Sequence, residues 1–365
     1  MSAAFPLVPG VAVSSSAEIA QILANPGFGV YFTDHMAQAD WTAEAGWQDS
    51  RIGPYEPFSL PPGGAVLHYA QEVFEGLKAY RRADGSVWLF RPELNARRLI
   101  RSAERMDLPA LPEEAFLASV EGLVRADAAW VPERDEETLY LRPFIFASEA
   151  FLGVRSARQV VYAVVASPSG AYFASGFRPI DIWVTSSFSR AGAGGTGAAK
   201  CGGNYASGLL ASKEAAAHGC GQVLFTDAAE HEWVEELGGM NVFFVTSDRR
   251  LLTPAVGNIL EGITRQSVLE LAPEFGLAPE ARPISLTELK AAIWSRDITE
   301  AFACGTAAVI TPIARFLFDD ESAGAEAEAA LAEPQGEMTQ ALRRRLVDIQ
   351  WGRASDPGGW TRRVI

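Results

Sequence analysis

Apolar and β-branched residues gather in short runs along the first half of the chain, and turn-forming residues bound each run. Such runs are typical of strands. The segments KAY and VWLF flank Asp84-Gly85 and predict a β-hairpin. The next segment, ELNARRLIRSAERMDL, has helical spacing, with Leu94, Leu99 and Met106 as expected core contacts. Two further runs, TLYLRPFIF and QVVYAVVAS, predict strands because they are rich in β-branched and aromatic residues.

The second half of the chain also mixes strand and helix patterns. Strands are predicted for IDIWVTSSF, for QVLFTD, for EAFACGTAAVITPI and for NVFFVTSDRRLLT, which turns at Asp248-Arg249. Helices are predicted over 204–218, ending at Gly219, and over ITRQSVLELAPEF, ending at Gly276. The acidic, alanine-rich ESAGAEAEAALAEPQGE predicts a solvated loop or a surface helix. The expected fold class is therefore α/β, of the mixed α+β kind.

A break in this pattern divides the chain. The segment SPSGAYFASGFRP, residues 167–179, holds two prolines, two glycines and three serines, a composition typical of a linker. A chain of 365 residues is also long for a single hydrophobic core. We therefore predict a smaller α/β domain over 1–170, an interdomain linker over 171–182 and a larger domain over 183–365.

Composition and charge exclude several classes of protein. The formal net charge of −14 disfavours nucleic acid as a partner, because phosphates would be repelled. The three cysteines show no CxxC spacing and the four histidines no H-x-x-x-H spacing, so we expect neither disulfides nor a metal site. The longest apolar run, VVYAVVA, is too short to cross a membrane, and the N-terminus lacks a basic signal region. These features favour a cytoplasmic protein that binds no membrane.

The segment GAGGTGAAKCGGNY places six glycines around Lys200 and has three interpretations. A P-loop requires a lysine directly after its second glycine, and Ala198 stands there, so that interpretation fails. Gly192, Gly194 and Gly197 match G-x-G-x-x-G after a strand, but AAKCGG separates them from good helix. A dinucleotide-binding oxidoreductase therefore remains an alternative.

In the third interpretation Lys200 is itself the reactive group. Most lysines are simply exposed, but small neighbours would let a flat cofactor approach this one. A pyridoxal phosphate site also needs a hydroxyl donor, an acid at the ring nitrogen and an anion hole. Tyr205, the Glu235-Glu236 pair, the helix start at 262–264 and Thr306 could supply them, although each has an ordinary structural explanation.

Six segments together resemble one family. They are LHYAQEVFEGLKAY, GTGAAKCGGNYA, EELGGMNVFFV, EGITRQS, ACGTAAV and DIQWG. The chain resembles the branched-chain amino-acid aminotransferases, two-domain pyridoxal phosphate enzymes of fold type IV, from about residue 28 to its C-terminus. The larger domain would then be the cofactor-binding one.

The resemblance implies specific site residues. Lys200 matches the catalytic lysine that forms the internal aldimine with pyridoxal 5'-phosphate. Tyr205 matches the donor to the ring hydroxyl, and Glu236, rather than Glu235, the acid at the ring nitrogen. The matches to the phosphate cup are Arg98, Ile263, Thr264 and Thr306. The matches to the substrate pocket are Tyr69, Phe74, Tyr140, Arg142, Tyr172, Ala307 and Ala308, the last two through backbone amides that would bind the α-carboxylate.

The activity implied is transfer of the amino group of leucine, isoleucine or valine to 2-oxoglutarate, giving the branched 2-oxo acid and glutamate. The partners expected are thus small amino acids and 2-oxo acids. Members of the family are at least homodimers, and FLGV at 151–154 resembles a loop that reaches the partner's pocket. A D-amino-acid aminotransferase or an aminodeoxychorismate lyase of the same fold would use the same lysine and glutamate. No CxxC follows GTA here, so thiol regulation at that point is not expected.

Overall fold

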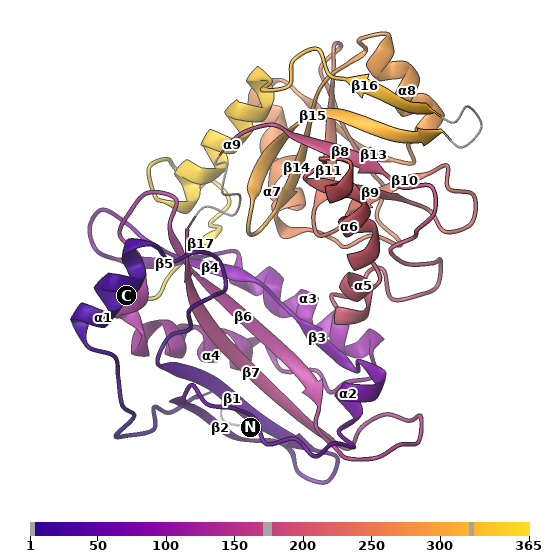
Figure 1. The fold of residues 1–365 in the computed structure, drawn as a ribbon. Helices are drawn as coiled ribbons and strands as arrows, with labels where there is room; N and C mark the ends of the chain where they lie inside the picture. Colours follow the sequence, from indigo (N-terminus) through magenta and orange to yellow (C-terminus); the bar gives the residue numbers. More distant parts are fainter. Residues whose placement is uncertain (1–3, 171–176, 321–324) are drawn as a thin grey trace. The chain divides into compact units, whose positions relative to one another are not determined.

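The computed structural model describes residues 4–170, 177–320 and 325–365 (Figure 1). These residues form two compact units. Unit 1 comprises 4–170, 199–202 and 348–365, and unit 2 comprises the other described residues, 177–198, 203–320 and 325–347.

The units do not follow the predicted domains, because 199–202 and 348–365 group with unit 1. Of the predicted linker, 171–182, residues 171–176 lie outside the described residues, and 180–182 belong to strand β8. The predicted domain boundaries at 170 and 183 stay a prediction.

Unit 1 is built on an antiparallel sheet. Its strand order is β17-β5-β4-β6-β7-β1-β2, with β3 also pairing with β6. The strands are β1 (His35–Thr42), β2 (Gly46–Pro54), β3 (Glu72–Phe74), β4 (Leu77–Arg81), β5 (Val87–Phe90), β6 (Thr138–Ala147), β7 (Gln159–Ser169) and β17 (Thr361–Arg363). The predicted hairpin at Asp84-Gly85 is confirmed as the β4–β5 pair, and the two later strands as β6 and β7.

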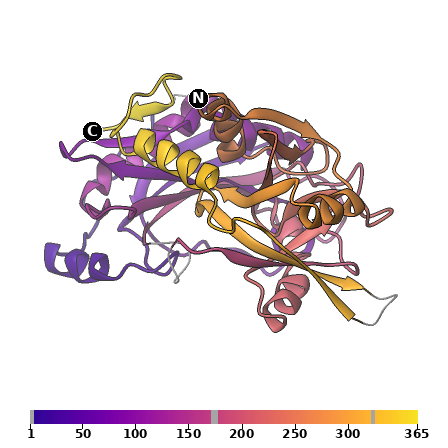
Figure 2. The ribbon, with the colours of Figure 1, turned by 90° about the horizontal axis from the view of Figure 1, so that it is seen from above.

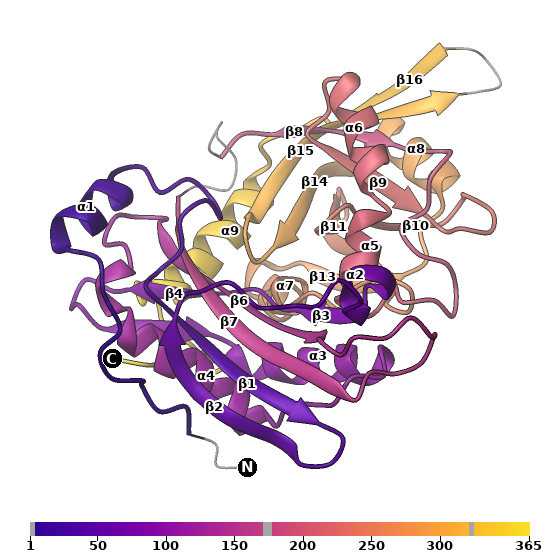
Figure 3. The same ribbon diagram turned by 60° about the horizontal axis from the view of Figure 1, so that its bottom comes forward.

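Two long helices of unit 1 lie side by side along one face of this sheet (Figure 3). The helices of unit 1 are α1 (Ser16–Ala24), α2 (Ala65–Tyr69), α3 (Pro92–Arg105), α4 (Glu113–Ala126) and the 3₁₀ turn Ala128–Trp130. Leu99 of α3 is buried in the core as predicted, together with Phe116 of α4 and Tyr162 of β7. The buried face of α3 also carries three polar residues, Asn95, Arg98 and Ser102, which its apolar pattern does not predict.

Unit 2 is built on a mixed sheet. Its strand order is β10-β9-β8-β15-β14-β11-β12-β13. Strand β16 pairs with β15, and Figure 2 shows these two strands side by side. The strands are β8 (Ile180–Val184), β9 (Gln222–Thr226), β10 (Val234–Leu237), β11 (Asn241–Thr246), β12 (Arg250–Pro254), β13 (Ala278–Arg282), β14 (Ile298–Gly305), β15 (Val309–Asp320) and β16 (Ala325–Ala330). β8 runs parallel to β9 and β15, and β12 runs parallel to β13. Together with the helices, these two sheets confirm the mixed α/β fold class.

Helices of unit 2 pack against its strands, α6 on β9, α7 on β14 and α8 on β14 and β16. The helices are α5 (Gly202–Ala206), α6 (Leu209–Ala217), α7 (Ile263–Leu271), the 3₁₀ turn Ala272–Phe275, α8 (Leu286–Trp294) and α9 (Glu337–Gln350). The first residue of α5 and the last three of α9 group with unit 1. Within the described part of the chain, no helix is long and apolar enough to cross a membrane.

Three predicted elements are wrong. The single helix over 204–218 is divided into α5 and α6, because the Ser207 hydroxyl bonds to backbone carbonyls and Gly208 is a poor helix former. The segment EAFACGTAAVITPI is not one strand but two, β14 and β15, with a turn at 306–308. Residues 325–330 form neither loop nor helix but strand β16, since pairing with β15 outweighs the helix propensity of alanine.

Candidate active site

Lys200 lies in a short segment that packs into unit 1. Its backbone N–H donates to Ser102 Oγ at 3.0 Å, and its carbonyl accepts a hydrogen bond from the Phe74 N–H at 2.9 Å. The Gly202 N–H donates to the carboxylate of Glu72. The neighbours of Lys200, Ala199 and Cys201, are both buried in the core of unit 1. The backbone on both sides of Lys200 is therefore fixed.

The glycines of this segment allow close approach of neighbouring groups. A Cβ at Gly202 would lie 2.3 Å from Glu72 Oε1, which is too close for any real contact. In unit 2 a Cβ at Gly197 would lie 1.9 Å from the Asn258 carbonyl oxygen. These two glycines are required by packing of the segment, so their spacing is no evidence for a phosphate loop.

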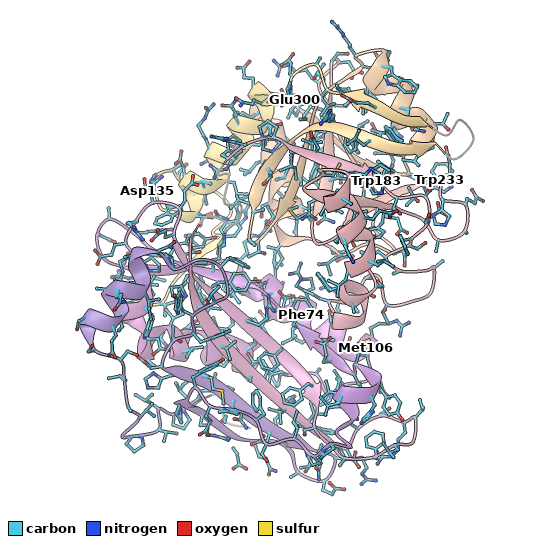
Figure 4. All side chains as sticks on the ribbon, viewed as in Figure 1. Phe74, Met106, Asp135, Trp183, Trp233 and Glu300 are labelled. Atoms are coloured by element: carbon cyan, nitrogen blue, oxygen red, sulfur yellow. The ribbon has the colours of Figure 1, made fainter. Side chains whose placement is uncertain are left out.

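The side chain of Lys200 is in an environment that disfavours its charge. Its Nζ lies 4.5 Å from the centre of the ring of Phe74, the last residue of β3. Phe74 is labelled in Figure 4. Burial lowers the pKa of Lys200 to about 8, and the cations Arg98 and Arg142 lower it too, whereas Glu75 and Tyr140 oppose them. A larger fraction of the amine is thus neutral near physiological pH than in an ordinary lysine, and the neutral amine is the form that acts as a nucleophile or base.

Arg98 is held in unit 1 by a buried carboxylate. Its Nε donates to Glu75 Oε1 at 2.6 Å and its Nη2 to Glu75 Oε2 at 2.9 Å. Both side chains are almost completely inaccessible to solvent. Burial alone would raise the pKa of Glu75, but Arg98, Lys200 and Asn95 together outweigh this effect and hold it below its ordinary range. Glu75 therefore stays ionised beside two cations.

Arg142 of β6 stands against two aromatic rings. Its guanidinium carbon lies 4.8 Å from the centre of the Phe74 ring and 5.4 Å from that of Tyr140. Its Nη2 donates to the Tyr140 hydroxyl at 3.3 Å, while its buried Nε has no hydrogen-bond partner among the described residues. It forms no ion pair within that part of the chain either. Such an arginine could bind a carboxylate of a ligand.

Glycine is required at position 76, next to this cluster. A Cβ at Gly76 would lie 2.0 Å from the Tyr140 hydroxyl oxygen. The ring of Tyr140 therefore occupies space that only glycine leaves open.

Tyr69 lies at the end of α2, and its hydroxyl donates to the Leu152 carbonyl oxygen in the 151–154 loop. Leu152 and Val154 are strongly exposed, at 73% and 89%. Tyr172, the remaining predicted pocket residue in this half of the chain, lies outside the described residues.

In unit 2, Glu236 of β10 accepts hydrogen bonds from three sides. Arg190 Nη2 lies 2.6 Å from Glu236 Oε1, and both side chains are buried. The Leu260 N–H donates to Oε1 at 2.9 Å, and Asn241 Nδ2 donates to Oε2 at 3.3 Å. Arg190 also donates to the carbonyl oxygen of Gly197 at 2.7 Å. Glu236 is thus a buried anion with strong donors.

Glu235 has a different environment from its neighbour. Its Oε1 accepts a hydrogen bond from Asn258 Nδ2 at 2.7 Å, and its Oε2 is buried with no partner among the described residues. Burial raises the pKa of Glu235. Of the two acids, Glu236 is the one whose carboxylate has an arginine partner and donors on both oxygens. The choice of Glu236 over Glu235 as the acid at the ring nitrogen stays a prediction.

Helix α7 begins at the predicted anion site. Ile263 and Thr264 are its first two residues, and the first amides of a helix have no intrahelical acceptor. A Cβ at Gly262 would lie 2.0 Å from Asn241 Oδ1. Asn241 therefore connects Glu236 with the start of this helix.

The remaining predicted residues of unit 2 lie in turns and in α5. Thr306, Ala307 and Ala308 form the turn between β14 and β15, and all three are partly buried. The next residue, Val309, has φ of 62°, a value that β-branched residues rarely adopt. Tyr205 of α5 has its ring beside Gly239, because a Cβ there would lie 3.9 Å from Tyr205 Cε1.

The predicted residues thus form two groups, each within one unit. Unit 1 brings together Phe74, Arg98, Tyr140, Arg142 and Lys200, with Tyr69 on α2 at the 151–154 loop. Unit 2 holds Tyr205, Glu236, Ile263, Thr264, Thr306, Ala307 and Ala308.

Four residues of these groups were missed from the sequence, namely Glu75, Ser102, Arg190 and Asn241. Glu75 and Asn241 stand in segments that carry the family resemblance, EVFEG and GGMN, where an acid beside an apolar run and an asparagine after two glycines were visible signals. Nothing in the local pattern distinguishes Ser102 or Arg190.

Comparison with known proteins gives consistent relatives. A family model described as amino-transferase class IV matches residues 72–316. A probable branched-chain-amino-acid aminotransferase of Streptomyces coelicolor is 50% identical over 360 residues, 97% of this chain and 97% of the relative. The branched-chain-amino-acid aminotransferase of Mycobacterium tuberculosis is 50% identical over 365 residues, covering 99% of this chain and 98% of the relative.

Solved structures agree with these relatives. A branched-chain aminotransferase from Thermoproteus uzoniensis, with norvaline, superimposes with a TM-score of 0.73 at 27% identity, covering 90% of this chain and 100% of that one. The holo form of the enzyme from Thermobaculum terrenum, with PLP, gives a TM-score of 0.70 at 28% identity, covering 90% and 98%.

Proposed function

The chain belongs to the class IV aminotransferases, and from that membership we propose that it is a branched-chain amino-acid aminotransferase. Its substrates would be leucine, isoleucine or valine with 2-oxoglutarate, and its products the branched 2-oxo acid and glutamate. Relatives of that name at 50% identity over nearly the whole chain support this assignment. The enzyme class, the fold type and the pyridoxal 5'-phosphate cofactor expected from the sequence are confirmed by the family and its solved members.

The residues present fit this cofactor. When bound, pyridoxal phosphate supplies an aldehyde carbon and an electron-accepting ring. Lys200 would be the attachment point, since about half of its amine is neutral near pH 8. Glu236 would accept a hydrogen bond from the N–H of the ring nitrogen. The ion pair with Arg190 favours the ionised form of that carboxylate. The remaining proposed contacts are Tyr205 to the ring hydroxyl and Arg98, Ile263, Thr264 and Thr306 to the phosphate.

Lys200 is also the proposed proton carrier. Once an amino acid has displaced it, its neutral Nζ would take the proton from the substrate Cα and deliver it to the aldehyde carbon of the cofactor, not back to Cα. The environment of Lys200 is the observation that carries the proposal, because burial and two arginines lower its pKa to about 8. An ordinary exposed lysine would be protonated and inactive as a base at that pH.

The substrate side chain would lie against Phe74 and Tyr140. An apolar branched chain gains from contact with aromatic rings, and Arg142 could bind the second carboxylate of glutamate through its free Nε. This arrangement offers one pocket for both kinds of side chain. Tyr69, Tyr172 and the amides of Ala307 and Ala308 complete the proposed contacts.

We also propose a homodimer that acts in the cytoplasm. The exposed apolar side chains of Leu152 and Val154 are suited to contact with a second copy. Light scattering of the purified protein should give twice the mass of the chain, and a monomeric mass would contradict this part of the proposal.

One experiment tests the central assignment. The holoenzyme is reduced with borohydride, and the modified peptide is located by mass spectrometry, with the adduct expected on Lys200. Lys200→Ala should lower kcat for leucine and 2-oxoglutarate by about 10²–10⁴-fold, because it removes the general base. The control Lys213→Ala, at an exposed position of α6, should keep the parent rate. An adduct on another lysine, or activity with D-alanine in place of L-leucine, would contradict the proposal.

A further inference from the structure

Glu75 is a buried acid with no part in the chemistry proposed above. It directly follows β3, and its side chain has no exposed surface. Removing a carboxylate from water is costly unless hydrogen bonds and opposite charge compensate. The partners that compensate Glu75 therefore indicate what it does.

Its carboxylate accepts hydrogen bonds from adjacent backbone and from side chains of α3. Arg98 occupies one oxygen through Nε and the other through Nη2, at 2.6 and 2.9 Å. Asn95 Nδ2 donates to Oε2 at 2.7 Å, and the Gly76 N–H donates to the same oxygen at 3.1 Å. This two-bond fork fixes the plane of the Arg98 guanidinium.

The same face of α3 also holds the Lys200 segment. Asn95, Arg98 and Ser102 follow one another at helical spacing, and all three are buried. Ser102 Oγ accepts the hydrogen bond from the Lys200 N–H. One helix face thus positions Glu75, the Arg98 guanidinium and the backbone of Lys200.

Arg98 and Lys200 are like charges in a poorly solvated environment. Arg98 lowers the pKa of Lys200 and Glu75 raises it. The other groups that act on Lys200 from the packed elements of unit 1 are Tyr140, which raises this pKa, and Arg142, which lowers it. Glu75 therefore offsets the repulsion that two arginines exert on the lysine.

We propose that Glu75 is a positioning residue of the cofactor site: it fixes Arg98 through its fork and offsets the repulsion between Arg98 and Lys200, so that both cations can serve one anionic cofactor. This inference rests on the proposed attachment of the cofactor at Lys200. Glu75 touches neither cofactor nor substrate in this role, and it acts through the two cations.

The test is a pH titration of the full-length holoenzyme, followed by the visible absorbance of the lysine-bound cofactor. Glu75→Gln keeps the shape of the side chain and removes its charge, so the titration midpoint should fall by about 1 pH unit. Glu75→Asp retains the charge and should restore at least half of that shift. A structural role alone would affect both variants without separating them in this way.

The control is Glu113→Gln. Glu113 pairs with Arg97 at 2.9 Å on the exposed side of α3, so this change removes an acid that pairs with the same helix. It should leave the midpoint where it is in the parent enzyme. A midpoint that Glu75→Gln leaves unchanged, or lowers no more than Glu113→Gln does, would overturn the inference.

A second pair of variants covers the case in which Glu75→Gln does not fold. The double variant Glu75→Gln with Arg98→Gln leaves neither charge of the pair buried alone. It should titrate at lower pH than Arg98→Gln, since only the single variant retains the negative charge, and equal midpoints would refute the role of Glu75. Absence of a borohydride-trapped Lys200 adduct in the parent would instead refute the proposed function itself.

Discussion

Each unit of the molecule contains a buried arginine–glutamate pair, and the two pairs are alike in geometry but not in surroundings. In unit 1 Arg98 Nε lies 2.6 Å from Glu75 Oε1. In unit 2 Arg190 Nη2 lies 2.6 Å from Glu236 Oε1. In unit 1 both members of the pair act on the pKa of Lys200, which Arg98 lowers and Glu75 raises. In unit 2 the glutamate instead accepts hydrogen bonds from an asparagine and a backbone amide next to the start of α7.

The difference shows that one kind of ion pair can serve opposite purposes. In unit 1 Glu75 offsets the repulsion between two cations, Arg98 and Lys200. In unit 2 Arg190 instead stabilises the negative charge of Glu236. Arg190 also ties two loops together, because it donates to the carbonyl oxygens of Gly197 and Asn258 at 2.7 and 3.3 Å. Buried pairs of this kind are weak evidence for stability, so their value must be sought in what they position.

Breaking the pair in unit 2 should have the largest effect on stability. Arg190→Met leaves Glu236 buried without its ion partner and should cost about 3–5 kcal/mol in the free energy of unfolding, measured by urea denaturation. Arg98→Met should cost less, because Lys200 becomes more readily protonated once the repulsion from Arg98 is gone.

The double variant Arg190→Met with Glu236→Gln is the control for this prediction. It removes both charges and should recover most of the lost stability. Equal stability of Arg190→Met and the parent protein would show that the pair is not buried as described.

Two glycines allow the pairs to be compared without removing a charge. Gly262→Ala would place a Cβ 2.0 Å from Asn241 Oδ1, and Gly76→Ala would place one 2.0 Å from the Tyr140 hydroxyl. Each should cost about 1–3 kcal/mol in unfolding free energy through overpacking. We expect Gly262→Ala to weaken cofactor binding, measured by equilibrium dialysis, and Gly76→Ala to raise KM for leucine.

A Cβ added at exposed Gly203 would meet no described atom within 4 Å outside its own helix backbone, so Gly203→Ala is the matched control for both glycine variants. If Gly76→Ala and Gly262→Ala lost the same cofactor affinity, the residues near Gly76 in unit 1 would not differ in role from those near Gly262 in unit 2.

The stability of the protein should depend on pH because the protonated form of Lys200 in unit 1 is disfavoured. Because the pKa of Lys200 is lowered from 10.5 to about 8, the unfolded chain binds more protons between these values, and stability rises with pH across that window. Lys200→Met removes this penalty and should gain about 1–2 kcal/mol below pH 8 in the cofactor-free protein.

Calorimetric melting of both proteins between pH 6 and about 10.5 measures the difference. It should shrink steadily above pH 8. A difference that does not change with pH would mean that Lys200 titrates as an ordinary lysine in the folded chain.

The smallest effect on stability is expected from Glu235 of unit 2, whose ionised form is disfavoured by burial. Burial raises the pKa of Glu235, so the folded chain binds more protons above the ordinary value of 4.5, and stability falls as pH rises through that window. Glu235→Gln should therefore gain about 1 kcal/mol or less at pH 7 and nothing near pH 4. The neighbouring change Glu236→Gln should lose stability at pH 7, and a gain there would contradict the assignment of the two acids.

Much of the fold could be read from local patterns. The β4–β5 hairpin, strands β6 and β7, helix α3 and the turn between β11 and β12 were all predicted, because periodicity and turn residues act over a few neighbours. The errors occurred where distant groups decide. β16 forms because β15 offers it a partner, and the break before α6 depends on a serine that bonds to the Arg190 carbonyl oxygen.

The sequence by itself determined the family and the cofactor, since these depend on short motifs whose residue types are readable in order, and the same motifs predict the lysine. Only the tertiary structure decided which charges meet. Glu75 and Arg98 are 23 positions apart, and nothing local distinguishes their pair from the exposed pair of Arg97 and Glu113. Burial makes that difference, because a charge removed from water must find its partner nearby, and burial is a property of the folded chain.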